Sequence, residues 1–163
     1  MALVCQDHLH DWAGRSFDRY NHWGDVLVLC NVGVLAAAAC QHYVTADAWK
    51  TLLLLCLFFY SLRGLMALLT SCRCDANAQQ RQWIIPGPDP EVWFLLSGHT
   101  ALTLLGTTTL WASSAPAPWK YGSWGLSALV IFFQAATREH YTVDVLLTAF
   151  MVALAYVGYI RRR

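Results

Sequence analysis

The chain has 163 residues, of which 57% are hydrophobic and only 13% are charged, and its formal net charge is +1. A near-neutral chain without a basic stripe does not suit nucleic-acid binding, so we exclude that class of partner. Length and composition predict an all-α protein with a single membrane-embedded domain over residues 1–163.

Five apolar segments follow one another along the chain, and each predicts a membrane-spanning helix. A soluble all-α domain is the alternative, but five such helices would leave it almost no polar face. An N-terminal interfacial segment is expected over 1–25, and the spans near 26–45, 50–70, 94–112, 123–138 and 142–160. The prediction is therefore a polytopic membrane helical bundle.

Arg63 interrupts the second segment, where it stands among large apolar residues. A charge inside a span is costly and is a functional-site hypothesis by default. Two anionic partners remain open. One is Asp144, in a purely structural ion pair, and the other is the phosphate of a ligand, which a guanidinium fits well.

The third segment opens with Ser97-Gly98-His99-Thr100. Taken alone, this string is typical of an ordinary helix start, because serine and glycine favour the residue before a helix. The threonines that follow are expected to bond carbonyls of their own helix or to pack against neighbours. They are Thr100, Thr103, Thr107, Thr108 and Thr109.

His140 and Asp144 begin the fifth segment, and their spacing puts both on one face of a helix. A carboxylate in that position can orient an imidazole and leave its other ring nitrogen nucleophilic. Glu139 and Tyr141 flank the histidine and are candidate supporting residues, as are Ser97 and Gly98.

If the spans alternate in direction, Arg63, His99, His140 and Asp144 share one end of the bundle. Two histidines, a carboxylate and a guanidinium suit phosphoryl-group transfer without a metal or cofactor. One imidazole would attack phosphorus and the other would protonate the leaving oxygen, while the cation would stabilise the phosphate oxygens.

The string Ser97–Thr100 and the string Glu139-His140-Tyr141-Thr142-Val143-Asp144-Val145 closely resemble the two catalytic motifs of the sphingomyelin synthase family. That family is a branch of the type-2 phosphatidic acid phosphatase superfamily. Residues 61–70 are similar to the family's arginine-bearing helix, and residues 11–21 are more weakly similar to the segment before its second helix. The family's first helix is expected to be absent from this chain.

The resemblance implies a catalytic triad of His99, His140 and Asp144, and no cofactor. It also implies membrane lipids as partners: phosphocholine or phosphoethanolamine would pass from phosphatidylcholine or phosphatidylethanolamine to ceramide, with release of diacylglycerol. The expected location is the Golgi or plasma membrane, or the endoplasmic reticulum, with an exoplasmic active site. The cluster Arg161–Arg163 after the last span favours a cytosolic C-terminus, which agrees with that orientation.

Two alternatives stand beside this function. A lipid phosphatase of the same superfamily would use water in place of ceramide as the acceptor. A non-catalytic truncated relative would bind lipid without transferring a group.

Overall fold

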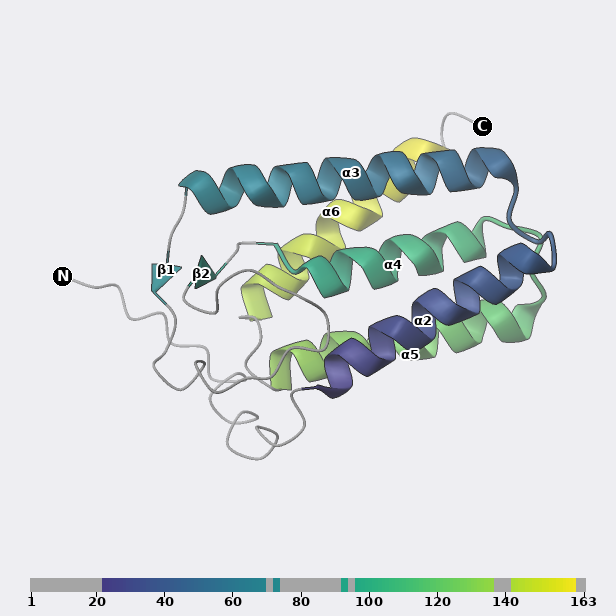
Figure 1. Cartoon of the computed structure of the whole chain (residues 1–163), viewed down its shortest axis with the longest axis horizontal. Helices are drawn as coiled ribbons and strands as arrows, with labels where there is room; N and C mark the ends of the chain where they lie inside the picture. The colour runs from purple at the N-terminus through teal and green to yellow at the C-terminus, as the bar shows by residue number, and fades with distance from the viewer. Residues whose placement is uncertain (1–21, 70–71, 74–91, 94–95, 137–141, 161–163) are drawn as a thin grey trace.

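The computed structural model describes residues 22–69, 72–73, 92–93, 96–136 and 142–160. These residues form five helices and one short strand pair (Figure 1). The strands are β1 (Cys72–Arg73) and β2 (Val92–Trp93), which pair antiparallel. The helices are α2 (Trp23–Cys40), α3 (Ala46–Leu69), α4 (Gly98–Trp111), α5 (Ala117–Ala136) and α6 (Thr142–Ile160). The predicted all-α class is confirmed, with one helix for each predicted segment.

The helices alternate in direction along the bundle (Figure 1). The first residues of α2, α4 and α6 therefore lie at the same end as the last residues of α3 and α5, and we call this the Arg63 end. Helix α4 is central and packs against the other four helices. At the opposite end, Ser114 joins two turns, because its N–H and Oγ both donate to the Tyr43 carbonyl at 3.3 and 3.2 Å. The alternation that the sequence argument required is present.

Four of the five helices begin at residues other than those predicted, and α3 begins at Ala46 rather than at 50. Helix α4 begins at Gly98 rather than at 94, because Ser97 has an extended backbone and caps the helix. Helix α5 begins at Ala117 rather than at 123. Its first turn contains Pro118, which is tolerated there because that turn needs no backbone N–H.

Helix α2 is shifted towards the N-terminus relative to its prediction. It begins at Trp23, so the last three residues of the predicted interfacial segment are helical, and residues 1–21 lie outside the described part. It ends at Cys40 rather than at 45. There His42 adopts a φ of 60°, and its N–H bonds the Ala39 carbonyl at 2.8 Å, which turns the chain out of the helix.

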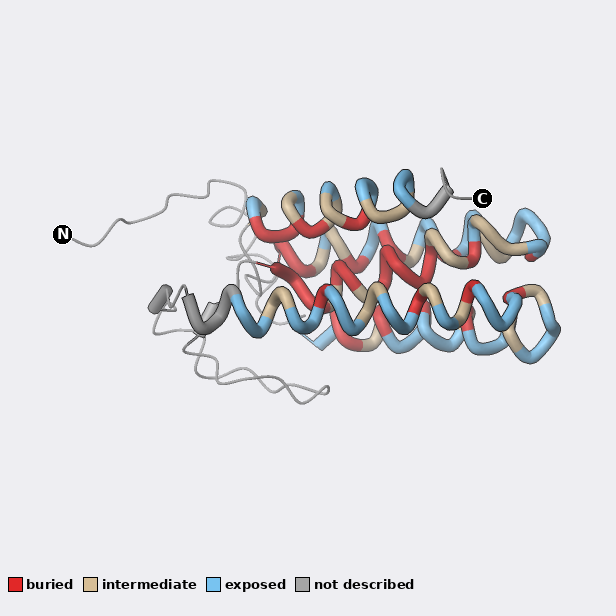
Figure 2. The backbone as a smooth tube through the Cα atoms, turned by 90° about the horizontal axis from the view of Figure 1, so that it is seen from above, coloured by how far each residue is buried: buried red, intermediate tan, exposed pale blue. Residues whose placement is uncertain are grey.

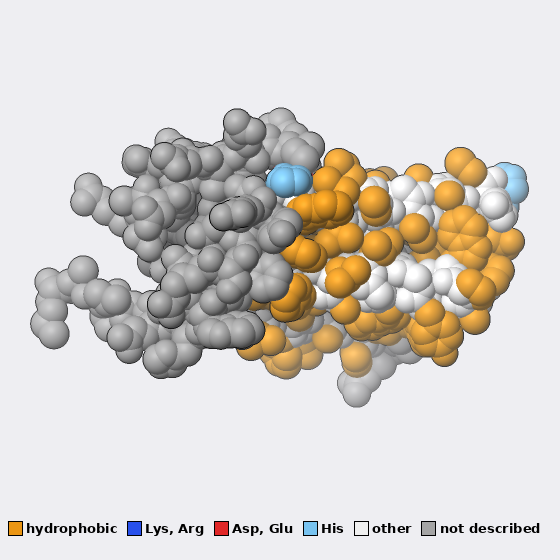
Figure 3. All heavy atoms as spheres, turned by 90° about the horizontal axis from the view of Figure 1, so that it is seen from below, with side chains coloured by type: hydrophobic (Ala, Val, Ile, Leu, Met, Phe, Trp, Pro, Cys, Tyr) orange, Lys and Arg blue, Asp and Glu red, His pale blue; other side chains and the backbone are white. Residues whose placement is uncertain are grey.

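The buried residues lie on the inner faces of the helices (Figure 2), and several of them are polar, whereas many large apolar side chains lie on the outside of the bundle. On the face in Figure 3, hydrophobic side chains cover most of the described surface. The outward apolar residues include Leu53, Leu54, Leu57, Phe58, Leu146 and Phe150, while Asp25, Asn31, Gln134, Asp144 and Thr148 are buried. The core also contains many apolar residues, such as Leu105 and Val130, so the unusual feature is the large exposed apolar surface together with several buried polar side chains.

Within the described residues, two helical stretches are long and apolar enough to cross a membrane by length and composition, Trp23–Cys40 and Ala46–Leu65. A third apolar stretch, Thr142–Gly158, is slightly shorter. In the α3 stretch Ala46–Leu65, only 11% of the residues are buried in the protein. A helix with so few buried residues and so much exposed apolar surface suits a membrane or a partner surface.

Candidate active site

Ser97 begins helix α4 and caps it. Its Oγ accepts a hydrogen bond from the Thr100 N–H at 3.2 Å, which satisfies one of the first free N–H groups of the helix. The simple interpretation of this string as a helix start is therefore confirmed for Ser97.

Ser97 also joins α4 to α5 and α6. Its Oγ donates to Gln134 Oε1 at 3.3 Å, and its backbone N–H donates to Thr148 Oγ1 at 2.9 Å. Thr148 Oγ1 in turn donates to the Asp144 carbonyl at 2.7 Å. Ser97, Gln134 and Thr148 have no exposed surface. The two motifs that the sequence singled out are thus connected through one buried threonine.

His99 contacts a carboxylate that the sequence analysis did not select. Its Nε2 lies 2.6 Å from Asp25 Oδ1, and the two side chains are 14% and 2% exposed. With Asp25 ionised, Nε2–H donates to the carboxylate, which orients the ring. Asp25 was assigned to the interfacial segment. The sequence feature that could have identified Asp25 is its position: it is an acidic residue at the start of a predicted span, at the same end of the bundle as His99.

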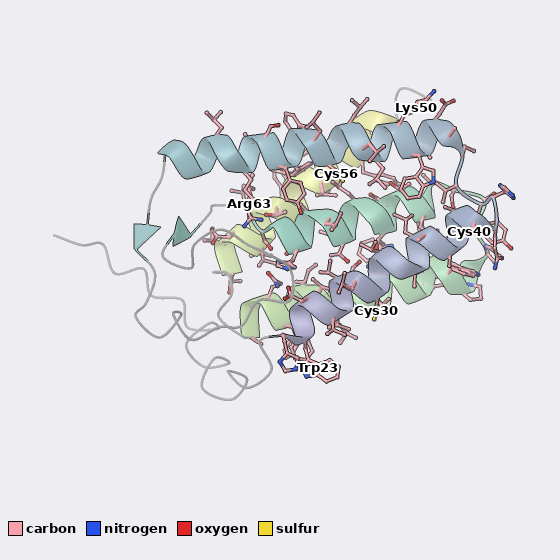
Figure 4. The ribbon with its side chains drawn as sticks, in the orientation of Figure 1. Trp23, Cys30, Cys40, Lys50, Cys56 and Arg63 are labelled. Carbon is pink, nitrogen blue, oxygen red and sulfur yellow. The ribbon has the colours of Figure 1, made fainter. Side chains whose placement is uncertain are left out.

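Arg63 reaches the start of α4 from α3 (Figure 4). A Cβ on Gly98 would overlap Arg63 Nη1, so the guanidinium occupies space that only glycine leaves open. The hollow around it is otherwise mostly apolar, with Phe59, Tyr60, Leu96 and Ala101 in its walls. A guanidinium and the positive end of a helix together favour an anion at this position.

The structure brings part of the predicted set together. Arg63, Gly98 and His99 lie at the Arg63 end, and Asp144 is buried in the first turn of α6 at that end. Glu139, His140 and Tyr141 lie outside the described residues, so the triad contact between His140 and Asp144 stays a prediction. Among the described residues, no three His, Cys, Asp or Glu side chains are grouped to hold a metal ion.

The α4 threonines divide into three kinds. Thr108 and Thr109 bond carbonyls of their own helix, as predicted. Thr103 and Thr107 instead bond side chains of α2 and α5. Thr100 is buried, and its Oγ1 has no hydrogen-bond partner in the described part of the chain. Spacing along one helix cannot separate these roles, because they depend on which neighbour each threonine faces.

Comparison with known proteins gives one match. Residues 94–161, which include both histidine motifs, match the family model described as PAP2 superfamily C-terminal. Searches among curated proteins and among solved structures found no match. The family match supports the type-2 phosphatidic acid phosphatase superfamily, whose members are phosphatases and phosphotransferases, and it does not distinguish the sphingomyelin synthase branch.

Proposed function

We propose that this protein is a membrane-embedded phosphotransferase of the sphingomyelin synthase type. It would move phosphocholine or phosphoethanolamine from a glycerophospholipid to ceramide and release diacylglycerol. One observation carries the proposal: the Arg63 guanidinium lies against Gly98 at the start of α4, and the next residue is the Asp25-bonded His99. An anion-binding group and an oriented proton carrier are therefore held at consecutive residues at the start of α4.

Each described residue has a role in this reaction. Arg63 binds the phosphate oxygens, because a guanidinium can donate two parallel hydrogen bonds to them. His99 is the general acid and base, and Asp25 holds its ring and stabilises the imidazolium form. Asp144 orients His140, as their spacing along the chain predicts.

The reaction proceeds in two displacements. A ring nitrogen of His140 attacks phosphorus, the bond from phosphorus to the diacylglycerol oxygen breaks, and His99 gives that oxygen a proton. His99 then takes the proton of the ceramide hydroxyl. The ceramide oxygen attacks phosphorus, the nitrogen–phosphorus bond breaks, and the product leaves with His140 restored.

The lipid substrates fit the outer surface of the bundle. Large apolar side chains point outward from α3 and α6. A bilayer around them would bring lipid headgroups to the Arg63 end without a soluble carrier. Lipids would then enter the site sideways from the bilayer.

The test of function is an assay with purified protein, labelled ceramide and vesicles of phosphatidylcholine and phosphatidylethanolamine. Labelled sphingomyelin or its phosphoethanolamine analogue supports the proposal. Phosphate release from phosphatidic acid without any transfer to ceramide would instead identify a lipid phosphatase. Absence of both reactions, with lipid binding retained, would identify the non-catalytic relative.

We further propose that the Arg63 end faces the exoplasmic side, in the Golgi or plasma membrane or in the endoplasmic reticulum. Cys40 is exposed and lies at the opposite end, whereas Cys72 follows α3 at the Arg63 end (Figures 1 and 4). Two variants would each retain one cysteine, either Cys72 or Cys40. For protein at the plasma membrane, an impermeant maleimide added outside intact cells should label Cys72 and leave Cys40 unlabelled. The inverse labelling pattern would contradict this orientation.

A further inference from the structure

Asn31 lies at the centre of a polar cluster that the proposed reaction does not use. Its Nδ2 contacts Thr103 Oγ1 at 2.6 Å, Ser127 Oγ at 3.0 Å, and the Ser123 carbonyl and Thr107 Oγ1 at 3.3 Å each. Its Oδ1 accepts from Ser123 Oγ at 2.8 Å. We call these five residues the Asn31 cluster, and all of them are buried.

The Asn31 cluster joins three helices at one level of the bundle. Asn31 comes from α2, Thr103 and Thr107 from α4, and Ser123 and Ser127 from α5. Thr107 Oγ1 also lies 2.6 Å from Ser123 Oγ and 2.7 Å from Ser127 Oγ. Asn31 Nδ2 therefore contacts side chains of both α4 and α5, and Asn31 Oδ1 accepts a hydrogen bond from Ser123 of α5.

The contact between Asp25 and His99 belongs to the same interface. Helices α2 and α4 run in the same direction, and Asn31 follows Asp25 by six residues while Thr103 follows His99 by four. At about 1.5 Å of rise per residue, the two contacts are separated by roughly 6–9 Å along the helices. Any slide of α2 along α4 would therefore move both contacts together.

Hydrogen bonds define this register more sharply than the apolar contacts around them. The inward residues of α2 beyond Asn31 are Leu35 and Ala38, which are apolar and pack in the core. Apolar contacts tolerate a shifted neighbour, whereas a buried amide loses its partners within about 1 Å of movement and is then costly to bury. Buried polar residues fix helix register in this way in coiled coils.

We propose that Asn31 is a positioning residue: it fixes α2 against α4 and α5 so that Asp25 meets His99. The role of the Asp25–His99 contact in transfer rests on the proposed function. The role of Asn31 in the register of the helices does not.

The main variant replaces polar partners together, so that no buried group is left unsatisfied. It combines Asn31→Leu, Thr103→Val and Ser127→Ala, and it leaves Thr107 and Ser123 to bond each other. Because matched apolar replacement is close to neutral for stability, this variant should fold with a similar thermal midpoint. We expect kcat to fall about tenfold with KM unchanged, since misplaced catalytic groups slow chemistry.

Two controls separate positioning from stability. Val28→Ala removes a buried side chain that lies between Asp25 and Asn31 on α2, so it should lower the thermal midpoint but keep kcat. In an Asp25→Asn background the triple variant should cause no further loss, because its effect passes through Asp25. An additional tenfold loss in that background would overturn the proposal.

A cross-linking experiment measures the register without activity. In a chain whose native cysteines are replaced, Asp25→Cys and His99→Cys are joined by a short bis-methanethiosulfonate linker. The cross-linked fraction should be high with the Asn31 cluster present and should fall severalfold in the triple variant. An unchanged fraction overturns the positioning role. If the wild-type protein lacks transferase activity but cross-linking depends on Asn31, the proposed function fails and the positioning role stands.

Discussion

The two sides of helix α4 are held by different kinds of contact. Towards α2 and α5, its neighbours include a set of polar side chains, because Thr103 and Thr107 lie in the buried Asn31 cluster. Towards α3, the contact is apolar: Leu52 and Phe59 of α3 belong to one core with Leu105 of α4. Both sides end in a candidate catalytic contact, His99 with Asp25 on the polar side and Gly98 with Arg63 on the apolar side.

The difference shows two ways of placing a functional group inside a helical bundle. On the polar side, hydrogen bonds select one register and so place the Asp25 carboxylate. On the apolar side, packing is less selective, and the guanidinium is placed by the missing side chain of Gly98. Substitutions on the polar side should therefore act by removing hydrogen bonds, and substitutions on the apolar side should act by changing side-chain volume.

The largest effect is expected from Asp25→Asn. The amide keeps the shape of the side chain but no longer stabilises a protonated His99, so kcat should fall about 100-fold or more. Asp47→Asn is the matched control, because Asp47 is exposed and contacts only Lys50, at 3.4 Å, among the ion pairs of the described residues. Steady-state transfer with labelled ceramide measures both. Equal activity of the two variants would exclude Asp25 from the site.

On the apolar side, Gly98→Ala should reduce transfer about 10- to 100-fold, because the new methyl group displaces the Arg63 guanidinium. Gly106→Ala is the control within the same helix. A Cβ there would lie 3.5 Å from Leu35 Cδ2, an ordinary contact, so activity should be retained. The comparison uses kcat/KM together with thermal midpoints. Full activity in Gly98→Ala would remove the phosphate-binding role from this position.

A smaller effect separates neighbouring threonines of α4. Thr107→Val removes one hydrogen-bond partner each from Ser123 and Ser127. The free energy of unfolding should therefore fall by about 1 kcal/mol. Thr108→Val removes only bonds to carbonyls of its own helix and should cost less than half as much. Thermal unfolding in detergent compares them. Equal shifts would mean that the Asn31 cluster contributes no more than local back-bonding.

The smallest effect is expected from Thr100→Val. Thr100 Oγ1 is buried without a hydrogen-bond partner in the described part of the chain, so replacing the hydroxyl by a methyl group removes an unsatisfied polar atom. The thermal midpoint should stay level or rise slightly, and transfer should be unchanged. A clear drop in activity would instead assign this hydroxyl a contact with substrate.

Sequence reasoning predicted the helices well, because long apolar segments report directly on the environment that they require. It selected Arg63 and His99 as candidates for a related reason, since a charged or titratable residue inside an apolar segment stands out. Helix ends were less accurate. The left-handed turn at His42 and the start of α5 at Ala117 depend on local backbone choices that hydrophobicity does not record.

The sequence by itself determined a helical bundle with an apolar surface and the residue types available for phosphoryl transfer. Only the tertiary structure decided that Asp25 meets His99, that Arg63 fills the space above Gly98, and that Asn31 has partners on two other helices. The physical reason is the distance along the chain over which each kind of information acts. Hydropathy and helix periodicity act within a few residues, whereas the contact between Asp25 and His99 joins positions 74 residues apart and forms only once the helices have packed.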